Sequence, residues 1–269
     1  MSSLLLIPKR KAVKSIALNA FKIIRLIRRQ RGCHYHLAES GVDGAAKIAM
    51  EAYALMAPRL GDIHGQTGLE IGPGDNLGVA DCFLANGARR MICVEQFPTV
   101  QRSEPMRNII YRRFGARKQG SPELIVAKFE TTSEKVDFIY SIDVLEHVSD
   151  VDATVKHIAD LLRPCGRSVH AVDFSGHNVF AGTGIDFLTC SDWAWNIMHS
   201  HLVTSNRVRL SQVTEAVINA GLSVCEIVPT RVIAEEDVEK IRPILNPRFV
   251  RFATPDLRVL EAIISFRAT

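Results

Sequence analysis

Along most of this chain, short apolar runs alternate with segments of helical periodicity, and this alternation limits the fold more than any other feature. The runs predict strands over residues 68–71, 91–94, 124–126, 138–142, 168–172, 222–228 and 260–266. The segments between them predict helices over residues 43–60, 77–86, 105–114, 151–162 and 211–221. Asp43 is the expected N-cap of the first helix, and Gly61 is its expected stop. Strands that alternate with helices of this length form βαβ units, so the pattern predicts a doubly wound α/β fold with a mostly parallel sheet.

The composition is that of an ordinary globular protein. Of the 269 residues, 47% are hydrophobic and 23% are charged, which argues against a disordered chain or a repeat array. The length allows one domain, or one domain with a modest appendage. The six cysteines are scattered and form no C-x-x-C pair, so neither a zinc site nor a disulfide framework is expected. We therefore expect a cytoplasmic protein in a reducing environment.

Positive charge is concentrated in the first segment. Residues 1–31 contain nine Lys and Arg residues, and no acidic residue precedes Glu39. Taking these nine from the net charge of +4 leaves −5 for the rest of the chain, which argues against nucleic acid as a partner. Residues 11–31 predict an amphipathic helix, so we assign 1–42 to a basic helical segment and 43–269 to the main domain. Such a helix either caps the domain or attaches the protein peripherally to the inner face of a membrane, and the sequence leaves both interpretations open.

The stretch G-L-E-I-G-P-G-D-N-L-G over residues 68–78 carries the strongest local signal. A strand leads into a tight turn at Gly72 and Gly74, and a helix follows directly. Glycine at these positions lets backbone amides approach a ligand, and the turn falls at the carboxyl end of the strand, where open α/β sheets bind ligands. Leu77 stands where a dinucleotide fingerprint needs its third glycine. Glu95 ends the second strand, where a carboxylate can accept both hydroxyls of a ribose.

Together with this turn, three further motifs resemble those of the class I S-adenosylmethionine-dependent methyltransferases. They are V-E at 94–95, F-I-Y-S-I-D-V-L-E-H-V at 138–148 and L-R-P-C-G at 162–166. The resemblance extends from about residue 43 to the C-terminus. It implies a Rossmann-like sheet of seven strands in which the last one is antiparallel, and it implies S-adenosylmethionine as the cofactor.

The resemblance also implies roles for individual residues. Glu70, Gly72 and Gly74 would border the methionine portion of the cofactor. Glu95 would hold the ribose, and Asp143 would lie near the methionine end. At one place this chain departs from the family pattern, because Lys128 stands near the position where relatives commonly carry an acid for the adenine amino group. The residue that receives the adenine is therefore not assigned.

Residues 174–207 interrupt the alternation of strands and helices. They contain both tryptophans, Phe180, Phe187 and three histidines. A long insertion at the carboxyl edge of a parallel sheet is where a lid or an acceptor pocket would lie. Three short motifs look like those of bacterial methyltransferases that act in glycan or secondary-metabolite pathways: D-x-x-x-H at 173–177, S-D-W-x-W at 191–195 and N-R-x-R at 206–209.

Two histidines are candidates for a catalytic base. His147 and His177 each follow a strand at the expected cofactor edge, and a hydroxyl acceptor has to lose its proton. His177 is preferred because it leads into the insertion, whereas His147 is equally well explained as a helix-start residue bonded to backbone. With Asp143 and Glu146, these histidines loosely resemble the carboxylate-and-histidine cluster of plant small-RNA methyltransferases. The first acid and the later histidine spacing differ from that pattern, so we expect no metal site.

These observations predict an enzyme that moves a methyl group from S-adenosylmethionine to a small acceptor. The expected acceptor group is a hydroxyl of a sugar, a glycan precursor or a secondary metabolite. Two alternatives stay open: a non-catalytic methyltransferase-like binding protein, and methylation of a lipid-linked acceptor at a membrane surface. The sequence assigns neither the acceptor itself nor the oligomeric state.

Overall fold

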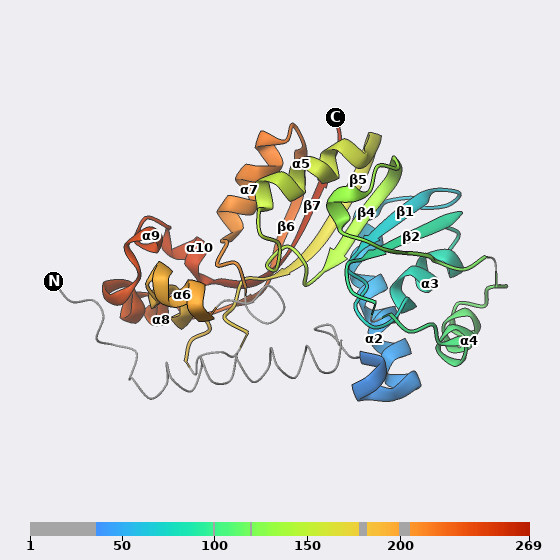
Figure 1. Cartoon of the computed structure of the whole chain (residues 1–269), viewed down its shortest axis with the longest axis horizontal. Helices are drawn as coiled ribbons and strands as arrows, with labels where there is room; N and C mark the ends of the chain where they lie inside the picture. Colours follow the sequence, from blue (N-terminus) through green and yellow to red (C-terminus); the bar gives the residue numbers. More distant parts are fainter. Residues whose placement is uncertain (1–35, 99, 119, 178–181, 199–204) are drawn as a thin grey trace.

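The computed structural model describes residues 36–269 except 99, 119, 178–181 and 199–204 (Figure 1). The basic helix predicted over residues 11–31 lies outside the described residues, as does most of the segment 1–42. No helix within the described part of the chain is long and apolar enough to cross a lipid bilayer.

Seven strands form one sheet in the order β3-β2-β1-β4-β5-β7-β6. Their bounds are β1 Thr67–Ile71, β2 Arg90–Glu95, β3 Glu123–Val126, β4 Val136–Ile142, β5 Leu162–Asp173, β6 Ser223–Val232 and β7 Val259–Arg267. Neighbours from β3 to β5 pair in parallel, whereas β7 pairs antiparallel with both β5 and β6. The predicted doubly wound sheet of seven strands with an antiparallel last strand is confirmed. The strand order reverses between β1 and β4, and sheets of this kind bind ligands at the carboxyl ends of the strands at such a point.

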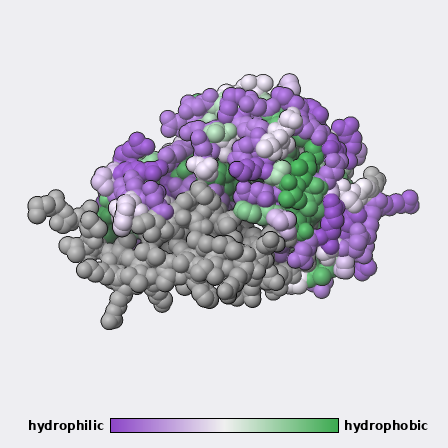
Figure 2. Space-filling model, viewed as in Figure 1, coloured by the Kyte–Doolittle hydropathy of each residue, from purple (hydrophilic) through white to green (hydrophobic). Residues whose placement is uncertain are grey.

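Helices cover both faces of this sheet. They are α2 His36–Leu60, α3 Gly78–Ala85, α4 Glu104–Arg113, η1 Phe129–Thr131, α5 Val151–Leu161 and α7 Leu210–Asn219. Successive residues of a strand point to opposite faces, so Met91 and Cys93 pack with α2, α3 and α4, while Ile92 and Val94 pack with α5 and α7. Figure 1 shows α5 and α7 at the top and α2, α3 and α4 at the lower right. In the same view the described surface is mostly hydrophilic, with one hydrophobic patch beside β1 and β4 (Figure 2).

A third, smaller core joins the insertion after β5 to the chain between β6 and β7. Its helices are η2 Asp186–Thr189, α6 Asp192–Met198, α8 Glu235–Ile241, η3 Arg242–Ile244, α9 Pro247–Val250 and α10 Thr254–Arg258. Phe187 and Trp195 of the insertion belong to the same buried cluster as Phe249 and Leu257 of the later segment. Figure 1 shows α6, α8, α9 and α10 grouped at one end of the molecule. The sequence predicts an insertion over residues 174–207 but not the helices between β6 and β7 that pack against it.

Helix α2 consists of two helical segments that meet at a kink, because Gly41 has a non-helical φ of 66° and ψ of −175°. The segment after the kink starts close to the predicted Asp43, whereas the segment before it, from His36, is not predicted. Gly61 has a φ of 76° and ends α2 as predicted. Strand β5 begins at Leu162, directly after α5, because Leu162 already pairs with β4. The L-R-P-C-G motif therefore starts the strand and does not separate it from the helix.

Candidate active site

The turn between β1 and α3 brings the backbone close to its neighbours. Gly72 and Gly74 have φ angles of 68° and 74°, in the left-handed region that favours glycine. A Cβ atom on Gly72 would lie 2.8 Å from Cγ2 of Val144, so any side chain there would collide with the loop after β4. The Gly72 N–H donates to the Val94 carbonyl at 2.9 Å, which ties the turn to β2. The geometry of the turn therefore requires glycine at position 72.

Glu95 lies beside this turn at the end of β2. Its carboxylate accepts hydrogen bonds from the Gly74 N–H at 3.3 Å and from the Phe97 N–H at 3.0 Å. Glu95 is only 7% exposed, and burial raises the pKa of its carboxyl above the ordinary value. The backbone N–H of Gln96 also bonds to this carboxyl group. A carboxylate offers about four lone-pair positions, so the three backbone bonds leave some acceptor capacity for a ligand.

A cavity lies against the same turn. Its apolar wall comes from α2 and consists of Ala45, Ile48, Ala49 and Ala52. The other lining residues belong to β1, the turn, α3 and the end of β4: Glu70, Gly72, Pro73, Gly74, Asn76, Val79, Ile142 and Asp143. Glu70, Gly72, Gly74 and Asp143, which the sequence analysis assigns to one ligand, thus surround one cavity. The motifs do not predict that α2 forms one wall of this cavity. The small residues of α2 at helical spacing are nevertheless a signal, because they allow a ligand or another element to pack closely against the helix.

Glu70 is a buried acid within this lining. It is 5% exposed, and the Cys93 thiol donates to its Oε2 atom at 3.5 Å. Burial raises the pKa of the Glu70 carboxyl to about 7. Near neutral pH the group is therefore partly protonated, and it can donate a hydrogen bond to a ligand as well as accept one.

A second group of polar side chains lies where β4 and β5 end. Asp143 follows β4 with a φ of 53°, and His177 lies four residues beyond β5 with a φ of 47°. Residues other than glycine rarely adopt this conformation, and such strained positions concentrate at functional sites. Glu146 and His147 follow Asp143 in the loop after β4. Because β4 and β5 are parallel neighbours, they deliver both loops to the same edge of the sheet.

The structure brings the two predicted histidines together with Glu146. One carboxylate oxygen of Glu146 and one ring nitrogen each of His147 and His177 lie within 4.8 Å of one another. The centroids of the two imidazole rings are 5.0 Å apart. Nε2 of His177 also lies 3.9 Å from Oδ2 of Asp173. This cluster adjoins the cavity through Asp143, which lines the cavity and precedes Glu146 by three residues.

Hydrogen bonds hold the loop of this cluster in place. The backbone N–H of Asn206 donates to the Glu146 carbonyl at 2.6 Å. The Asn206 side-chain amide donates to the carbonyls of Leu145 at 2.8 Å and Val148 at 3.0 Å. Oε1 of Glu146 accepts from the Asp173 N–H at 3.2 Å, which joins the loop after β4 to the end of β5.

The N-R-x-R motif, used above only for the class of substrate, has a structural function. Arg209 is fully buried, and its guanidinium donates to the carbonyls of Phe174 at 2.7 Å and Val259 at 2.5 Å. Arg207 is 2% exposed and donates to the Cys190 carbonyl at 3.0 Å. Arg209 therefore joins the start of the insertion to the start of β7, whereas Arg207 stabilises the insertion internally.

Electrostatically, the cluster is rich in carboxyl groups. Burial is the largest cause that raises the pKa of Glu146 well above its ordinary value, and the neighbouring Asp143 and Asp173 add to it. The guanidinium of Arg231 lies 3.4 Å from Oδ1 of Asp173 and 2.7 Å from Oε1 of Glu261. Arg231 is thus shared between two acids, and the buried guanidinium of Arg209 also interacts electrostatically with Asp173.

The aromatic residues of the insertion have different positions. Phe187 and Trp195 are buried in the third core, and the guanidinium of Arg207 lies 5.1 Å from the centre of the Trp195 ring. Trp193, by contrast, is 70% exposed. Phe180 lies outside the described residues. The exposure of Trp193 follows from its helix α6, whose buried side already carries Trp195.

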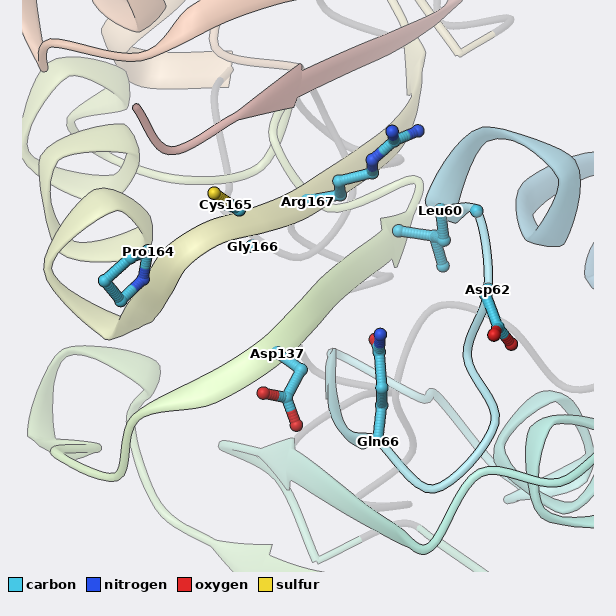
Figure 3. A pocket seen from close by; sticks show the side chains of 9 residues that line it. Leu60, Asp62, Gln66, Asp137, Pro164, Cys165, Gly166 and Arg167 are labelled. Carbon is cyan, nitrogen blue, oxygen red and sulfur yellow. The ribbon is translucent and has the colours of Figure 1, made fainter.

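Another cavity lies at the opposite edge of the sheet, at the amino ends of β1 and β4 (Figure 3). It is lined by Leu60, Gly61, Asp62, Gln66, Asp137, Pro164, Cys165, Gly166 and Arg167. None of the site residues predicted from the sequence lies there. The carboxyl edge of the sheet therefore holds the candidate active site.

The fold and the glycine turn define a class I methyltransferase, which uses S-adenosylmethionine as its cofactor. A family model described as a methyltransferase domain matches residues 44–227, so the chain belongs to this family. No curated protein matches the sequence.

Solved structures agree with this fold. A candidate sarcosine dimethylglycine methyltransferase from Galdieria sulphuraria is 15% identical, with 95% of this chain and 98% of that chain covered and a TM-score of 0.51. A candidate methyltransferase from Haloferax volcanii, in complex with the Trm112 methyltransferase activator, is 20% identical, with 86% and 94% covered and a TM-score of 0.50. Phosphoethanolamine N-methyltransferase 2 from Haemonchus contortus, in complex with S-adenosylmethionine, is 16% identical, with 87% and 58% covered and a TM-score of 0.50. At these identities the likeness supports the fold alone.

Proposed function

We propose that this methyltransferase acts on a hydroxyl group of a small acceptor, namely a sugar, a glycan precursor or a secondary metabolite. The proposal rests on the pair of imidazoles in the loops after β4 and β5, whose ring centroids are 5.0 Å apart. The first of these loops also contains Asp143, which lines the cavity. An unprotonated amine attacks a methyl group without first losing a proton, whereas a hydroxyl needs a proton acceptor. Imidazole is suited to that role near neutral pH.

We assign the cofactor to the cavity along the β1–α3 turn. The remaining acceptor capacity of Glu95 fits the ribose, and the turn at Gly72 and Gly74 lets the backbone approach the ligand. Glu70 and Asp143 fit the ammonium group of the methionine portion, because both line the cavity as acids. Bound there, S-adenosylmethionine supplies an electrophilic methyl group on a positively charged sulfur.

We assign the proton acceptor to His177, with His147 as the second choice. His177 takes the proton of the acceptor hydroxyl and later releases it to water. The hydroxyl oxygen forms a bond to the methyl carbon as the carbon–sulfur bond breaks, and the bonding electrons stay on sulfur. The products are a methyl ether and S-adenosylhomocysteine. Because this is an in-line displacement, the rest of the site acts by alignment and by exclusion of water.

A screen of hydroxylated metabolites for S-adenosylhomocysteine formation tests this proposal. With the acceptor found, His177→Ala should lower turnover at saturating cofactor by about a hundredfold to ten-thousandfold. His64→Ala is the matched control, because His64 is an exposed histidine before β1 at the other edge of the sheet. If His177→Ala keeps near wild-type turnover and unchanged cofactor affinity, His177 is not the proton acceptor and His147 becomes the candidate. If His147→Ala is also fully active, the cluster does not take the proton.

A lipid-linked acceptor is the second candidate, and the nine basic residues of the segment 1–31 favour it. Full-length protein should bind anionic vesicles at low salt and dissociate from them as salt is added, because the attraction is partly electrostatic. Protein without residues 1–31 should bind S-adenosylmethionine with unchanged affinity but no vesicles. Equal vesicle binding by both proteins excludes this role for the segment.

A further inference from the structure

The cluster at the ends of β4 and β5 has the donor atoms of a metal site. Glu146, His147 and His177 each offer one ligand atom, and these three atoms lie within 4.8 Å of one another. Two imidazole nitrogens and one carboxylate oxygen are the protein ligands of one group of catalytic zinc sites, which keep a position open for water or substrate. Ligands on a tetrahedral zinc ion lie about 3.3 Å apart, given bonds of about 2.0–2.1 Å. Small rotations of the two histidine side chains would therefore close the three groups around one ion.

The burial of Glu146 is an independent observation that points to a ligand. Glu146 is 2% exposed, and its Oε1 atom accepts the Asp173 N–H. Its Oε2 atom is buried and has no hydrogen-bond partner among the described residues. Buried carboxylates are normally paired or bound to a metal ion, because an isolated one loses its hydration without compensation. Oε2 is therefore available to a cation.

The surrounding charge favours a cation at the same place. Asp143 and Asp173 both act electrostatically on Glu146, so three carboxyl groups share this edge of the sheet. Arg231 contacts Asp173, but its side chain is 46% exposed and is also paired with Glu261. Such a pair is weakened by solvent, so it compensates little of the negative charge near Glu146. The buried Arg209 also interacts electrostatically with Asp173, but its guanidinium donates to the backbone carbonyls of Phe174 and Val259.

We infer that Glu146, His147 and His177 bind one divalent transition-metal cation, for which Zn²⁺ is the probe. Imidazole ligands suit zinc and its neighbours, whereas Mg²⁺ and Ca²⁺ take oxygen ligands. From the sequence we expect no metal site, because the spacing between positions 147 and 177 does not show that the loop after β5 lies against the loop after β4. The parallel pairing of β4 with β5 brings the two loops together.

The catalytic role of this cation rests on the proposed function, whereas its binding does not. A divalent cation lowers the pKa of a neighbouring hydroxyl group. With the cation bound, His147 and His177 would be its ligands, and the proton of the acceptor would pass to water rather than to His177. Oxygen–carbon bond formation and carbon–sulfur bond cleavage are the same as in the metal-free route.

Binding is tested on full-length protein that has been freed of metal with a chelator and then desalted. Calorimetric titration with Zn²⁺ should show one site that Glu146→Gln weakens by about a hundredfold or more, as expected for the loss of a charged ligand. Glutamine keeps an acceptor for the Asp173 N–H, so the loop should stay folded. His177→Ala should show the same loss, and His64→Ala should bind as wild type. Mg²⁺ at equal concentration should not compete.

Two further readouts separate the outcomes. Co²⁺ bound to imidazoles absorbs differently from hydrated Co²⁺ in the visible range, so wild type should change the cobalt spectrum and Glu146→Gln should not. S-adenosylmethionine affinity within about twofold of wild type shows that each variant is folded. Equal zinc affinity and stoichiometry in wild type and Glu146→Gln overturns the inference. Unchanged hydroxyl methylation after metal removal overturns the catalytic role of the cation but leaves the proposed function in place.

Discussion

Replacement of Gly72 by alanine should lower the free energy of unfolding for two reasons, a strained backbone conformation and a steric clash. The φ of 68° at this position costs an L-residue roughly 1–2 kcal/mol. The new Cβ would lie 2.8 Å from Cγ2 of Val144, and overpacking of this kind costs typically about 1–3 kcal/mol. Gly72→Ala should therefore lower the free energy of unfolding by about 2–5 kcal/mol. Gly65→Ala is the matched control, because Gly65 has a φ of 71° but no atom within 4 Å of the new Cβ.

Urea denaturation of the variants measures both costs. Gly65→Ala should lose only the conformational part, about 1–2 kcal/mol. In the Gly72→Ala background, Val144→Ala removes the opposing methyl group and should recover about 1–3 kcal/mol relative to the sum of the single changes. The reasoning is refuted if Gly72→Ala destabilises no more than Gly65→Ala, or if the two changes at 72 and 144 are additive.

Three further predictions address the ribose contact, a buried acid and the third core. Glu95→Gln should weaken S-adenosylmethionine binding about tenfold to 150-fold by calorimetry, since hydrogen bonds to a charged group contribute about 1.5–3 kcal/mol; unchanged affinity removes Glu95 from the site. The pKa of Glu70 is raised from 4.5 to about 7 by burial, so its contribution to stability is present below about pH 4.5 and is lost as pH rises through 7. Denaturation between pH 4 and 8 should show wild type losing about 3 kcal/mol relative to Glu70→Gln, and a pH-independent difference contradicts this. Trp195→Ala should cost about 3–5 kcal/mol and Trp193→Ala less than about 0.5, because Trp195 is 3% and Trp193 is 70% exposed; equal effects contradict the assignment of Trp195 to the core.

Local sequence signals predict the central sheet well. Each strand from β1 to β5 is an apolar run next to a helix with its own stop signal, so its position depends on residues close in the chain. The turn at Gly72 and Gly74 is predicted for the same reason, because only glycine suits its left-handed φ angles. Motif spacing then places Glu95 and Asp143 at the carboxyl edge. In the structure Glu95 bonds to the turn, and Asp143 lines the cavity.

Features that depend on distant contacts are not predicted. The segment between β6 and β7 has no strand–helix rhythm, because its short helices α8, α9 and α10 are stabilised by packing on the insertion after β5. The α2 wall of the cavity is missed because small residues such as Ala45 and Ala49 have no distinctive chemistry. The cluster of Glu146 with His177 depends on the register of β4 against β5, which no local pattern contains.

The central claim is that the methyl group goes to an oxygen next to the His147–His177 pair. S-adenosylmethionine carrying an isotopically labelled methyl group, incubated with the full-length protein and hydroxylated sugars or metabolites, tests this directly by nuclear magnetic resonance of the product. The expected result is a labelled methyl ether whose formation is lost in His177→Ala and retained in His64→Ala. A label found on nitrogen or carbon, or a methyl ether formed at the wild-type rate by both His177→Ala and His147→Ala, would contradict the claim.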